Sequence, residues 1–320
     1  MSYELSQDQV QALNGITDTL LNAAPDSSAV AVLTGAAGTG KSTIIQEIIN
    51  LARNKPIPMH INLCATTHRA AAVLADITGH TVHTGHTLFK LRPGINKYGK
   101  ETLKINSNSK LLDPIKGSLI ILYEASMVGD NFLKAIVEVV KERFLKILFV
   151  GDPYQLPPTL NNCSLFDGSL KTFTLTTIHR QHEKNPILTK ALEYRDFIAG
   201  YSKTEPTINT SINDQNEGIH LLSKKEFTSA FVKKYINYEV GAKVDIPMCS
   251  FTNAAAINYN NMVRKATYFL EDTVAPFYAG ERLISNNRVV SQNDDRIYLN
   301  NNEEVTVVNW HKDSLLKENS

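Results

Sequence analysis

The sequence is poor in the residues that mark secreted, zinc-binding or membrane-spanning proteins. Its 320 residues include three cysteines, Cys64, Cys163 and Cys249, which lie far apart and form no C-x-x-C pair. Neither a disulfide framework nor a zinc site is indicated, and the reducing interior of a cell fits best. No run of about eighteen apolar residues suggests a membrane span, and the N-terminus lacks the pattern of a signal peptide.

The sequence also lacks a charge bias. Lys and Arg together number 33 and Asp and Glu 32, so the formal net charge is +1. Any affinity for nucleic acid must then come from local patches, because the global charge neither supports nor excludes it. With 42% hydrophobic residues and no evident repeat, the composition is that of an ordinary globular protein long enough for two domains.

What the sequence does contain is a phosphate-binding loop. Residues 35–42, Gly-Ala-Ala-Gly-Thr-Gly-Lys-Ser, match the pattern G-x-x-x-x-G-K-[ST] at every fixed position. Apolar residues predict a buried strand over 29–34 before the loop and a helix over 42–51 after it. Backbone N–H groups and the helix N-terminus would direct partial positive charge at phosphate oxygens. The sequence therefore predicts a nucleoside triphosphate site; a glycine-rich turn that matches by chance is the alternative.

Other predicted strands end in polar residues. Strands over 59–65, 118–122 and 145–150 lead into Thr67-His68, Glu124 and the segment 151–158, Gly-Asp-Pro-Tyr-Gln-Leu-Pro-Pro. Because the carboxyl ends of parallel strands border the ligand crevice, we expect these residues near the phosphate loop. Gln155 could sense the γ-phosphate or position water. A lone histidine such as His68 has a structural interpretation as well as a functional one.

One position departs from the usual acidic motif of phosphate-loop NTPases. In that motif an Asp holds Mg²⁺ through water and the loop hydroxyl, and the following Glu polarises the attacking water. Here Glu124 is present, but Tyr123 stands at the aspartate position. A phenol with a pKa of about 10 is neutral at pH 7 and cannot replace an anionic Mg²⁺ partner. Tyr123 therefore weakens the case for Mg²⁺-dependent hydrolysis.

The rhythm of strands and helices breaks between residues 81 and 113. Basic and aromatic residues, among them His86, Phe89 and Arg92, alternate there around a Pro93-Gly94 turn. We expect a small β-hairpin or an inserted subdomain that stands off the sheet. Such mixing suits single-stranded nucleic acid, since rings stack on bases and cations meet phosphates. From composition alone, a polar surface excursion is the competing interpretation.

Past residue 185 the pattern starts again. Pro186 is a good first residue for a helix over 186–198. A strand near 219–222, a helix over 226–238, a strand near 246–251, a helix over 253–268 and short strands up to about residue 308 are expected to follow. We therefore predict a first domain over residues 1–184 and a partial second α/β domain over residues 185–320.

Taken together, these residues resemble the superfamily 1 DNA helicases in the RecD-like branch, superfamily 1B, with the Dda-type helicases of phages as the nearest likeness. The likeness runs from residue 5 to about 308 and is most specific at 35–42 and 151–158. It implies an α/β fold of the P-loop NTPase class: a RecA-like parallel sheet with helices on both faces. A small β-hairpin insert at about 87–113 and an incomplete second RecA-like domain would complete it.

The resemblance also implies roles for individual residues. Lys41 would reach the phosphates, Glu124 would be the catalytic base, Gln155 the γ-phosphate sensor, and Arg180 an arginine that contacts the γ-phosphate. Ser42 and Glu124 would hold the metal. The residues expected to contact the nucleotide are Gln9, Gly35, Ala36, Ala37, Gly38, Thr39, Gly40, Lys41, Ser42, Thr43 and Asp152. Those expected on the DNA path are Thr67, His68, His86 and Asn253.

The implied function is that of an ATP-dependent DNA helicase that moves 5′ to 3′ on single-stranded DNA, with ATP and Mg²⁺ as cofactors. A monomer in the cytoplasm is expected (the host cytoplasm if a phage encodes it), with no membrane partner and with replication or single-strand-binding proteins as further candidates. Late family segments are not found, so the chain is expected to be truncated. The alternative is a hydrolysis-deficient module that binds ATP and single-stranded DNA. A phosphate-loop kinase is disfavoured by the segment 151–158.

Overall fold

The structure is a computed structural model of two compact units, residues 1–207 and 208–320. The residues that it describes are 4–95, 101–105, 112, 114–158, 163–179, 185–236, 248–268, 277–285, 289–290, 297–299 and 303–309.

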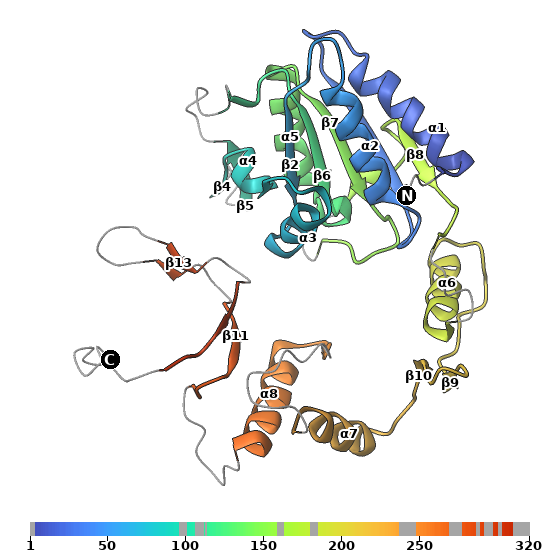
Figure 1. Cartoon of the computed structure of the whole chain (residues 1–320), viewed down its shortest axis with the longest axis vertical. Helices are drawn as coiled ribbons and strands as arrows, with labels where there is room; N and C mark the ends of the chain where they lie inside the picture. Colours follow the sequence, from blue (N-terminus) through green and yellow to red (C-terminus); the bar gives the residue numbers. More distant parts are fainter. Residues whose placement is uncertain are drawn as a thin grey trace. The chain divides into compact units, whose positions relative to one another are not determined.

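A six-stranded sheet forms the centre of the first unit (Figure 1). Its strands, in the spatial order β3-β2-β6-β7-β1-β8, are β3 (Val82–Thr84), β2 (Ile61–Ala65), β6 (Leu119–Tyr123), β7 (Lys146–Gly151), β1 (Ala29–Gly35) and β8 (Thr172–Leu175). Every neighbouring pair is parallel. The carboxyl ends of all six strands therefore meet at one edge of the sheet, where open parallel sheets bind ligands.

Two apolar layers cover the faces of the sheet. Along β6, Leu119 and Ile121 belong to one buried cluster, whereas Ile120 and Leu122 belong to the other. Because both faces are buried, the strands read as continuous apolar runs. The first layer holds α1 (Gln7–Ile16), the π-helical turn η1 (Thr17–Leu21), α2 (Lys41–Arg53) and α3 (His68–Thr78), and the second holds α5 (Asp130–Glu142). The predicted α/β fold with helices on both faces is confirmed.

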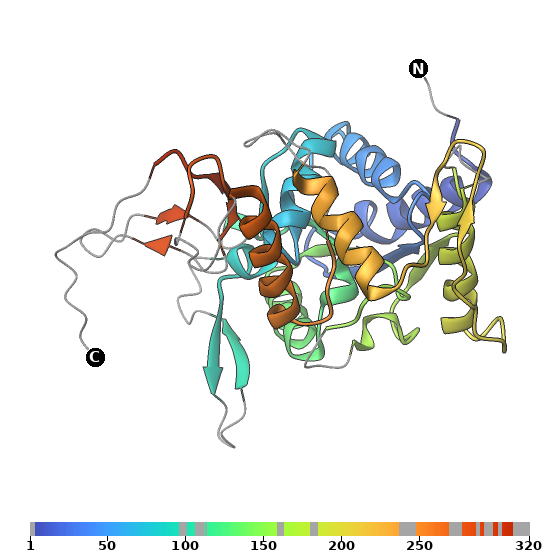
Figure 2. The ribbon, with the colours of Figure 1, turned by 90° about the horizontal axis from the view of Figure 1, so that it is seen from below.

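The predicted hairpin insert is also present. After the short helix α4 (Gly85–Leu88), β4 (Leu91–Ile95) pairs antiparallel with β5 (Glu101–Ile105). Figure 2 shows the hairpin projecting away from the sheet. Its base is tied to the core, since Leu91 is buried and Leu103 packs against the α5 layer. Residues 96–100 and 106–111 of the predicted insert lie outside the described part of the chain.

Helix α6 (Pro186–Ile198) begins and ends where the sequence predicts. Its start is set by Pro186 at the first position and by Asn185, whose side chain accepts a hydrogen bond of 2.9 Å from the backbone N–H of Ile187. The helix lies in the first unit, because the compact units divide after Thr207. The predicted domain boundary, after residue 184, instead assigned helix α6 to the second domain.

The described residues of the second unit form two helices and short antiparallel strand pairs. Phe227 and Phe231 of α7 (Lys224–Ile236) pack edge-on against Tyr259 of α8 (Asn253–Tyr268), with ring centroids 6.2 and 5.9 Å apart. The pairs are β9 (Ser211–Ile212) with β10 (Gly218–Ile219), β11 (Arg282–Ile284) with β14 (Glu304–Thr306), and β12 (Val289–Val290) with β13 (Ile297–Leu299). That residues 185–320 form a partial RecA-like domain stays a prediction.

One predicted strand of the second unit is not formed. Residues 248–251 of the strand expected near 246–251 are irregular, and residues 246–247 lie outside the described part. A strand requires a paired neighbour, and the segment instead leads into the N-cap of α8, where Thr252 Oγ1 accepts a hydrogen bond of 3.1 Å from the N–H of Ala255. None of the described helices is both long and apolar enough to cross a bilayer.

The buried face of α2 offers a test of this packing. Ile45 is fully buried in the cluster on the α2 face, whereas Leu51 of the same helix is 40% exposed. We expect Ile45→Ala to lower the free energy of unfolding by about 2–5 kcal/mol, because it leaves a cavity. Leu51→Ala should cost less than about 1 kcal/mol. Urea denaturation would measure both, and equal losses would contradict the burial described here.

Candidate nucleotide-binding site

The loop between β1 and α2 has the backbone that phosphate binding requires. Gly38 and Gly40 have φ values of +86° and +83°, in the left-handed region that favours glycine. A Cβ at Gly40 would come within 2.2 Å of Gln9 Nε2, so both conformation and close approach exclude a side chain there. Since α2 begins at Lys41, its N-terminal N–H groups are directed at the loop. The loop is therefore shaped to receive an anion.

Two side chains hold the loop in this shape. The Lys41 ammonium donates to the carbonyl oxygens of Gly35 and Ala36, at 2.7 and 2.9 Å. The buried amide of Gln9 donates from Nε2 to the Thr39 carbonyl and accepts at Oε1 from the N–H of Ser6, both at 3.0 Å. Gln9 thus joins helix α1 to the loop, and its predicted contact with adenine stays a prediction.

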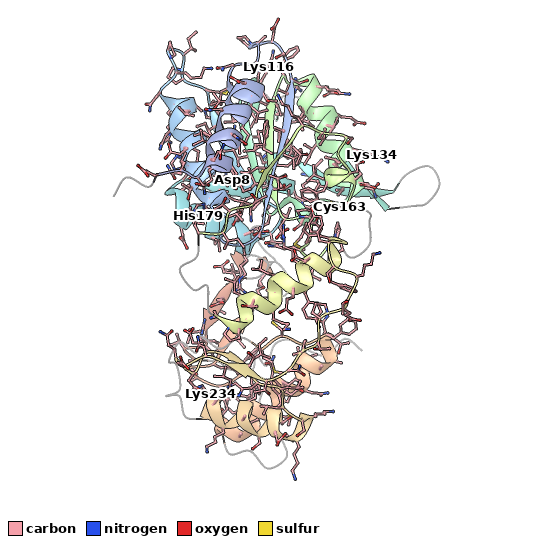
Figure 3. All side chains as sticks on the ribbon, turned by 90° about the vertical axis from the view of Figure 1, so that its right-hand side faces the viewer. Asp8, Lys116, Lys134, Cys163, His179 and Lys234 are labelled. Carbon is pink, nitrogen blue, oxygen red and sulfur yellow. The ribbon has the colours of Figure 1, made fainter. Side chains whose placement is uncertain are left out.

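Asp8 fastens the segment after β8 to the same helix. One carboxylate oxygen accepts hydrogen bonds from the N–H groups of Thr176 and Thr177, at 2.7 and 2.9 Å. Two residues later the N–H of His179 donates to the carbonyl of Gly38 in the phosphate loop, at 2.9 Å. Figure 3 shows Asp8 and His179 near one another on this side of the unit. The segment that leads to Arg180 is therefore tied to both α1 and the loop.

These hydrogen bonds change the acidity of Asp8. Partial burial raises its pKa, but hydrogen bonds from Ser6, Thr177 and Thr176 outweigh that effect and hold the pKa well below its usual range. Asp8 is therefore a carboxylate at every physiological pH, and its charge is matched by directed N–H groups.

Glu124 follows β6 at the same edge in a strained conformation. Its φ and ψ of 55° and 46° lie in the left-handed region, which costs a residue other than glycine about 1–3 kcal/mol. The Thr66 hydroxyl holds this conformation by donating to the Glu124 carbonyl at 3.1 Å. Gly151 at the end of β7 permits the close approach, since a Cβ there would lie 3.2 Å from the Ala125 nitrogen.

The side chains of Tyr123 and Glu124 are electrostatically linked to the loop. Burial raises the pKa of the Glu124 carboxyl; Lys41 opposes this rise, and Asp152 adds to it. Burial also raises the pKa of Tyr123; the neighbouring Glu124 carboxylate adds to this rise, and Ser42 opposes it. Tyr123 is therefore a neutral phenol at pH 7, placed between the loop hydroxyl and the carboxylate.

The residues present do not fit the Mg²⁺ site that the fold implies. Mg²⁺ in such sites is held by oxygen ligands in near-ideal octahedral geometry, with a carboxylate among its partners. Here a phenol occupies the carboxylate position and engages Ser42, the expected ligand. In the described part of the chain, no group of three or more His, Cys, Asp or Glu residues could hold a metal ion. The assignment of Ser42 and Glu124 as metal ligands stays a prediction, and Tyr123 argues against it.

The third carboxylate at this edge, Asp152, is already paired. Nη1 of Arg195, from helix α6, lies 2.7 Å from both of its oxygens, and the guanidinium is 4.6 Å from the centre of the Tyr154 ring. Asp152 also accepts from the N–H of Tyr154 at 3.1 Å, and its carbonyl accepts from the N–H of Gln155 at 3.1 Å. This turn presents the exposed side chain of Gln155 at the sheet edge.

The predicted DNA-path residues fall at two places. Thr67 caps α3 by accepting from the N–H of Ala70 at 3.1 Å, and His68 is the first residue of that helix. His86 stacks on Phe132 with ring centroids 4.7 Å apart, and burial lowers its pKa. These three follow β2 and β3 at the same sheet edge.

Asn253 begins α8 in the second unit. Arg180 lies outside the described residues.

Comparison with known proteins identifies the family of this chain. A family model described as an AAA domain matches residues 4–197, more than half of the chain. The chain belongs to this AAA domain family. Its relatives place it with the RecD-like helicases of superfamily 1B, as the motifs predict. The nearer likeness to Dda-type helicases stays a prediction.

Individual relatives cover parts of the chain. The ATP-dependent RecD2 DNA helicase of Deinococcus radiodurans is 35% identical over 162 residues, 50% of this chain and 21% of the relative. The RecBCD enzyme subunit RecD of Buchnera aphidicola is 26% identical over 290 residues, 76% of this chain and 47% of that protein. The chain thus spans less than half of the length of these two relatives.

A solved structure supports the fold. The crystal structure of the Pif1 helicase from Candida albicans aligns with a TM-score of 0.50 at 20% identity, covering 90% of this chain and 58% of that one. At this identity the likeness concerns the fold alone.

The structure places three residues at the site of this AAA domain to which the sequence motifs assign no role. Asp8, Tyr154 and Arg195 make the contacts described above; Tyr154 lies within the segment 151–158, and the other two lie outside the quoted motifs. Asp8 precedes Gln9 in the sequence, and Tyr154 precedes Gln155. Their position next to a predicted site residue could therefore have indicated both. Arg195 lies on a helix far along the chain, where no local pattern points to Asp152.

Asp8 provides a pH-dependent test of the tie between α1 and the β8 segment. We expect Asp8→Asn to lower stability by about 1–2 kcal/mol at pH 7, because charge-assisted hydrogen bonds are weakened. The folded pKa lies below the unfolded value of about 3.9, so this contribution is present above that pH and is lost as pH falls through the folded pKa. Thermal unfolding of both chains from pH 7 to 3 should therefore show the difference shrinking.

A matched control is Asp18→Asn, which removes an exposed carboxylate that accepts a hydrogen bond from Asn22 in the same N-terminal segment. Its stability should change little at any pH. A difference for Asp8→Asn that stays constant down to pH 3 would contradict the role of the ionised carboxylate.

Proposed function

We propose that the first unit is the nucleotide-binding motor domain of an ATP-dependent DNA helicase that moves 5′ to 3′ along single-stranded DNA. The observation that carries the proposal is the convergence of three segments at the carboxyl edge of one parallel sheet. These are the phosphate loop with Lys41, the end of β6 with Glu124, and the turn that presents Gln155. The membership in the AAA domain family and the names of the relatives support it.

In this proposal each residue acts on the triphosphate. Lys41, now held by two loop carbonyls, would turn to the β- and γ-phosphates, where its charge is worth more than in water. Glu124 would accept the proton of the attacking water, and its raised pKa brings it nearer to the range of an effective base. Gln155 would contact the γ-phosphate, and Arg180 would supply positive charge from the segment tied down by Asp8.

Single-stranded DNA would follow the same sheet edge. Thr67, His68 and His86 lie beyond the ends of β2 and β3, and the β4–β5 hairpin projects beside them. The ring of His86, neutral at pH 7, could stack with a base, as aromatic side chains do in single-strand channels. Asn253 would contribute a contact from the second unit. Nucleotide binding and release would shift the grip of these residues and so produce translocation.

A second candidate is a module that binds ATP and single-stranded DNA but hydrolyses little. One observation favours it: a neutral phenol, Tyr123, lies beside Ser42 and Glu124, where the family carries a carboxylate. In that case ATP would act as a conformational ligand, whose binding alone changes the DNA grip.

The nucleotide site is tested by Lys41→Ala. We expect its affinity for a fluorescent ATP analogue to fall about tenfold or more, because hydrogen bonds between charged groups are lost. Lys116→Ala removes an exposed lysine just before β6, at the opposite end of the strands, and should leave the affinity unchanged. An equal affinity of the Lys41→Ala variant and the unchanged chain would remove the phosphate-loop assignment.

The two candidates are separated by Tyr123→Asp. We expect the restored carboxylate to raise Mg²⁺-dependent phosphate release in the presence of single-stranded DNA by about tenfold or more, the usual worth of a residue that orients metal ligands. Tyr123→Phe removes the hydroxyl without adding a carboxylate and should show no such gain. Rapid DNA-stimulated turnover by the unchanged chain, with no gain in the Asp variant, would reject the second candidate.

A further inference from the structure

Helix α6 packs on the first unit with partly buried side chains only. None of its 13 residues is buried, although it follows the sheet directly in sequence. Its described contact with the sheet edge is polar: Arg195 reaches Asp152 and lies over the ring of Tyr154. The ion pair is therefore a direct polar link between α6 and the turn that follows β7.

The ion pair is partly removed from water. The side chains of Arg195 and Asp152 are 21% and 6% exposed, and Nη1 lies 2.7 Å from each carboxylate oxygen. Tyr154 covers one face of the guanidinium at 4.6 Å and is itself hydrogen-bonded with Tyr201. Charge-assisted hydrogen bonds of this kind are stronger and more directional than those of exposed surface pairs.

Asp152 is the anchor of the turn that carries Gln155. Its side chain accepts from the N–H of Tyr154 while its carbonyl accepts from the N–H of Gln155, both at 3.1 Å. If a neutral residue replaced Arg195, the Asp152 carboxylate would lose the charge-assisted hydrogen bonds that Arg195 donates. A buried carboxylate that loses such a partner turns toward water, and that movement would release the turn.

We propose that Arg195 is a positioning residue that holds the Asp152 turn so that Gln155 can distinguish a nucleoside triphosphate from a diphosphate. The inference rests on the proposed function, that nucleotide binds at residues 35–42. It adds that α6, through Arg195, holds in place the turn that contacts the γ-phosphate. The backbone of the phosphate loop surrounds the phosphates that both nucleotides share, and Lys41 also reaches the γ-phosphate, whereas the Gln155 turn meets only the phosphate that differs.

The test compares the affinities of the full chain for ATP and for ADP, measured by competition against one fluorescent nucleotide. We expect Arg195→Gln to lose the preference for ATP by about fivefold or more, a typical coupling between two sites, while the affinity for ADP stays unchanged. Arg195→Lys should recover part of the preference, because it keeps the charge beside Asp152 but not the planar stack on Tyr154.

Lys190→Gln is the matched control. It removes one positive charge from the same helix, where Lys190 pairs with the exposed Glu193, and it should leave the ATP preference intact. A merely structural ion pair would lower the affinities for ATP and ADP together, and that outcome would overturn the proposal. An unchanged ATP preference in Arg195→Gln, or a Lys variant no better than the Gln variant, would overturn it as well.

The failure of the proposed function gives a different result. If the unchanged chain bound neither nucleotide better than Lys41→Ala does, the nucleotide site itself would be wrong and the inference would fall with it. If the unchanged chain bound ATP and ADP equally well, nucleotide binding would stand and the sensing role of the Gln155 turn would be overturned.

Discussion

The parallel pairing of six buried strands is the constraint on which the rest of the first unit depends. It brings the carboxyl ends of β1, β2, β3, β6, β7 and β8 to one edge, so that segments more than a hundred residues apart in sequence meet there. The strands are apolar on both faces, and their side chains are divided between the α2 and α5 layers. The polar residues that follow the strands are thereby gathered at one edge of the sheet.

Ties between neighbouring strand ends hold this edge together. Asp8 and Gln9 connect α1 to the β8 segment and to the phosphate loop, and Thr66 fixes the strained backbone of Glu124. These contacts use hydrogen bonds to backbone groups, which set loop positions more closely than apolar packing can. The backbone of this edge is therefore held in place by contacts within the protein itself.

Charge balance at the edge differs from that expected for a hydrolysing motor. Tyr123 supplies a neutral phenol to Ser42 and Glu124, and Arg195 neutralises Asp152, so the edge carries fewer uncompensated carboxylates than its motifs imply. Lys41 lowers the pKa of Glu124, while burial and Asp152 raise it. The pKa of Glu124 therefore depends on the positions of Lys41 and Asp152. The nucleotide, by drawing Lys41 away from Gly35 and Ala36, would change this balance.

Local features of the sequence were sufficient for the fold class, the phosphate loop, the hairpin insert and most element boundaries. Helix α6 and helix α8 begin and end as predicted, because Pro186 and Thr252 act through their immediate neighbours. The glycines of the loop likewise act through their own φ angles.

Only the tertiary structure decided the partners of Asp8, Asp152 and Tyr123, and the union of α6 with the first unit. Arg195 and Asp152 are joined across 43 positions of sequence, and Asp8 and Thr176 across 168. No local propensity encodes such a pairing, because its free energy arises only when the sheet has brought the two groups together.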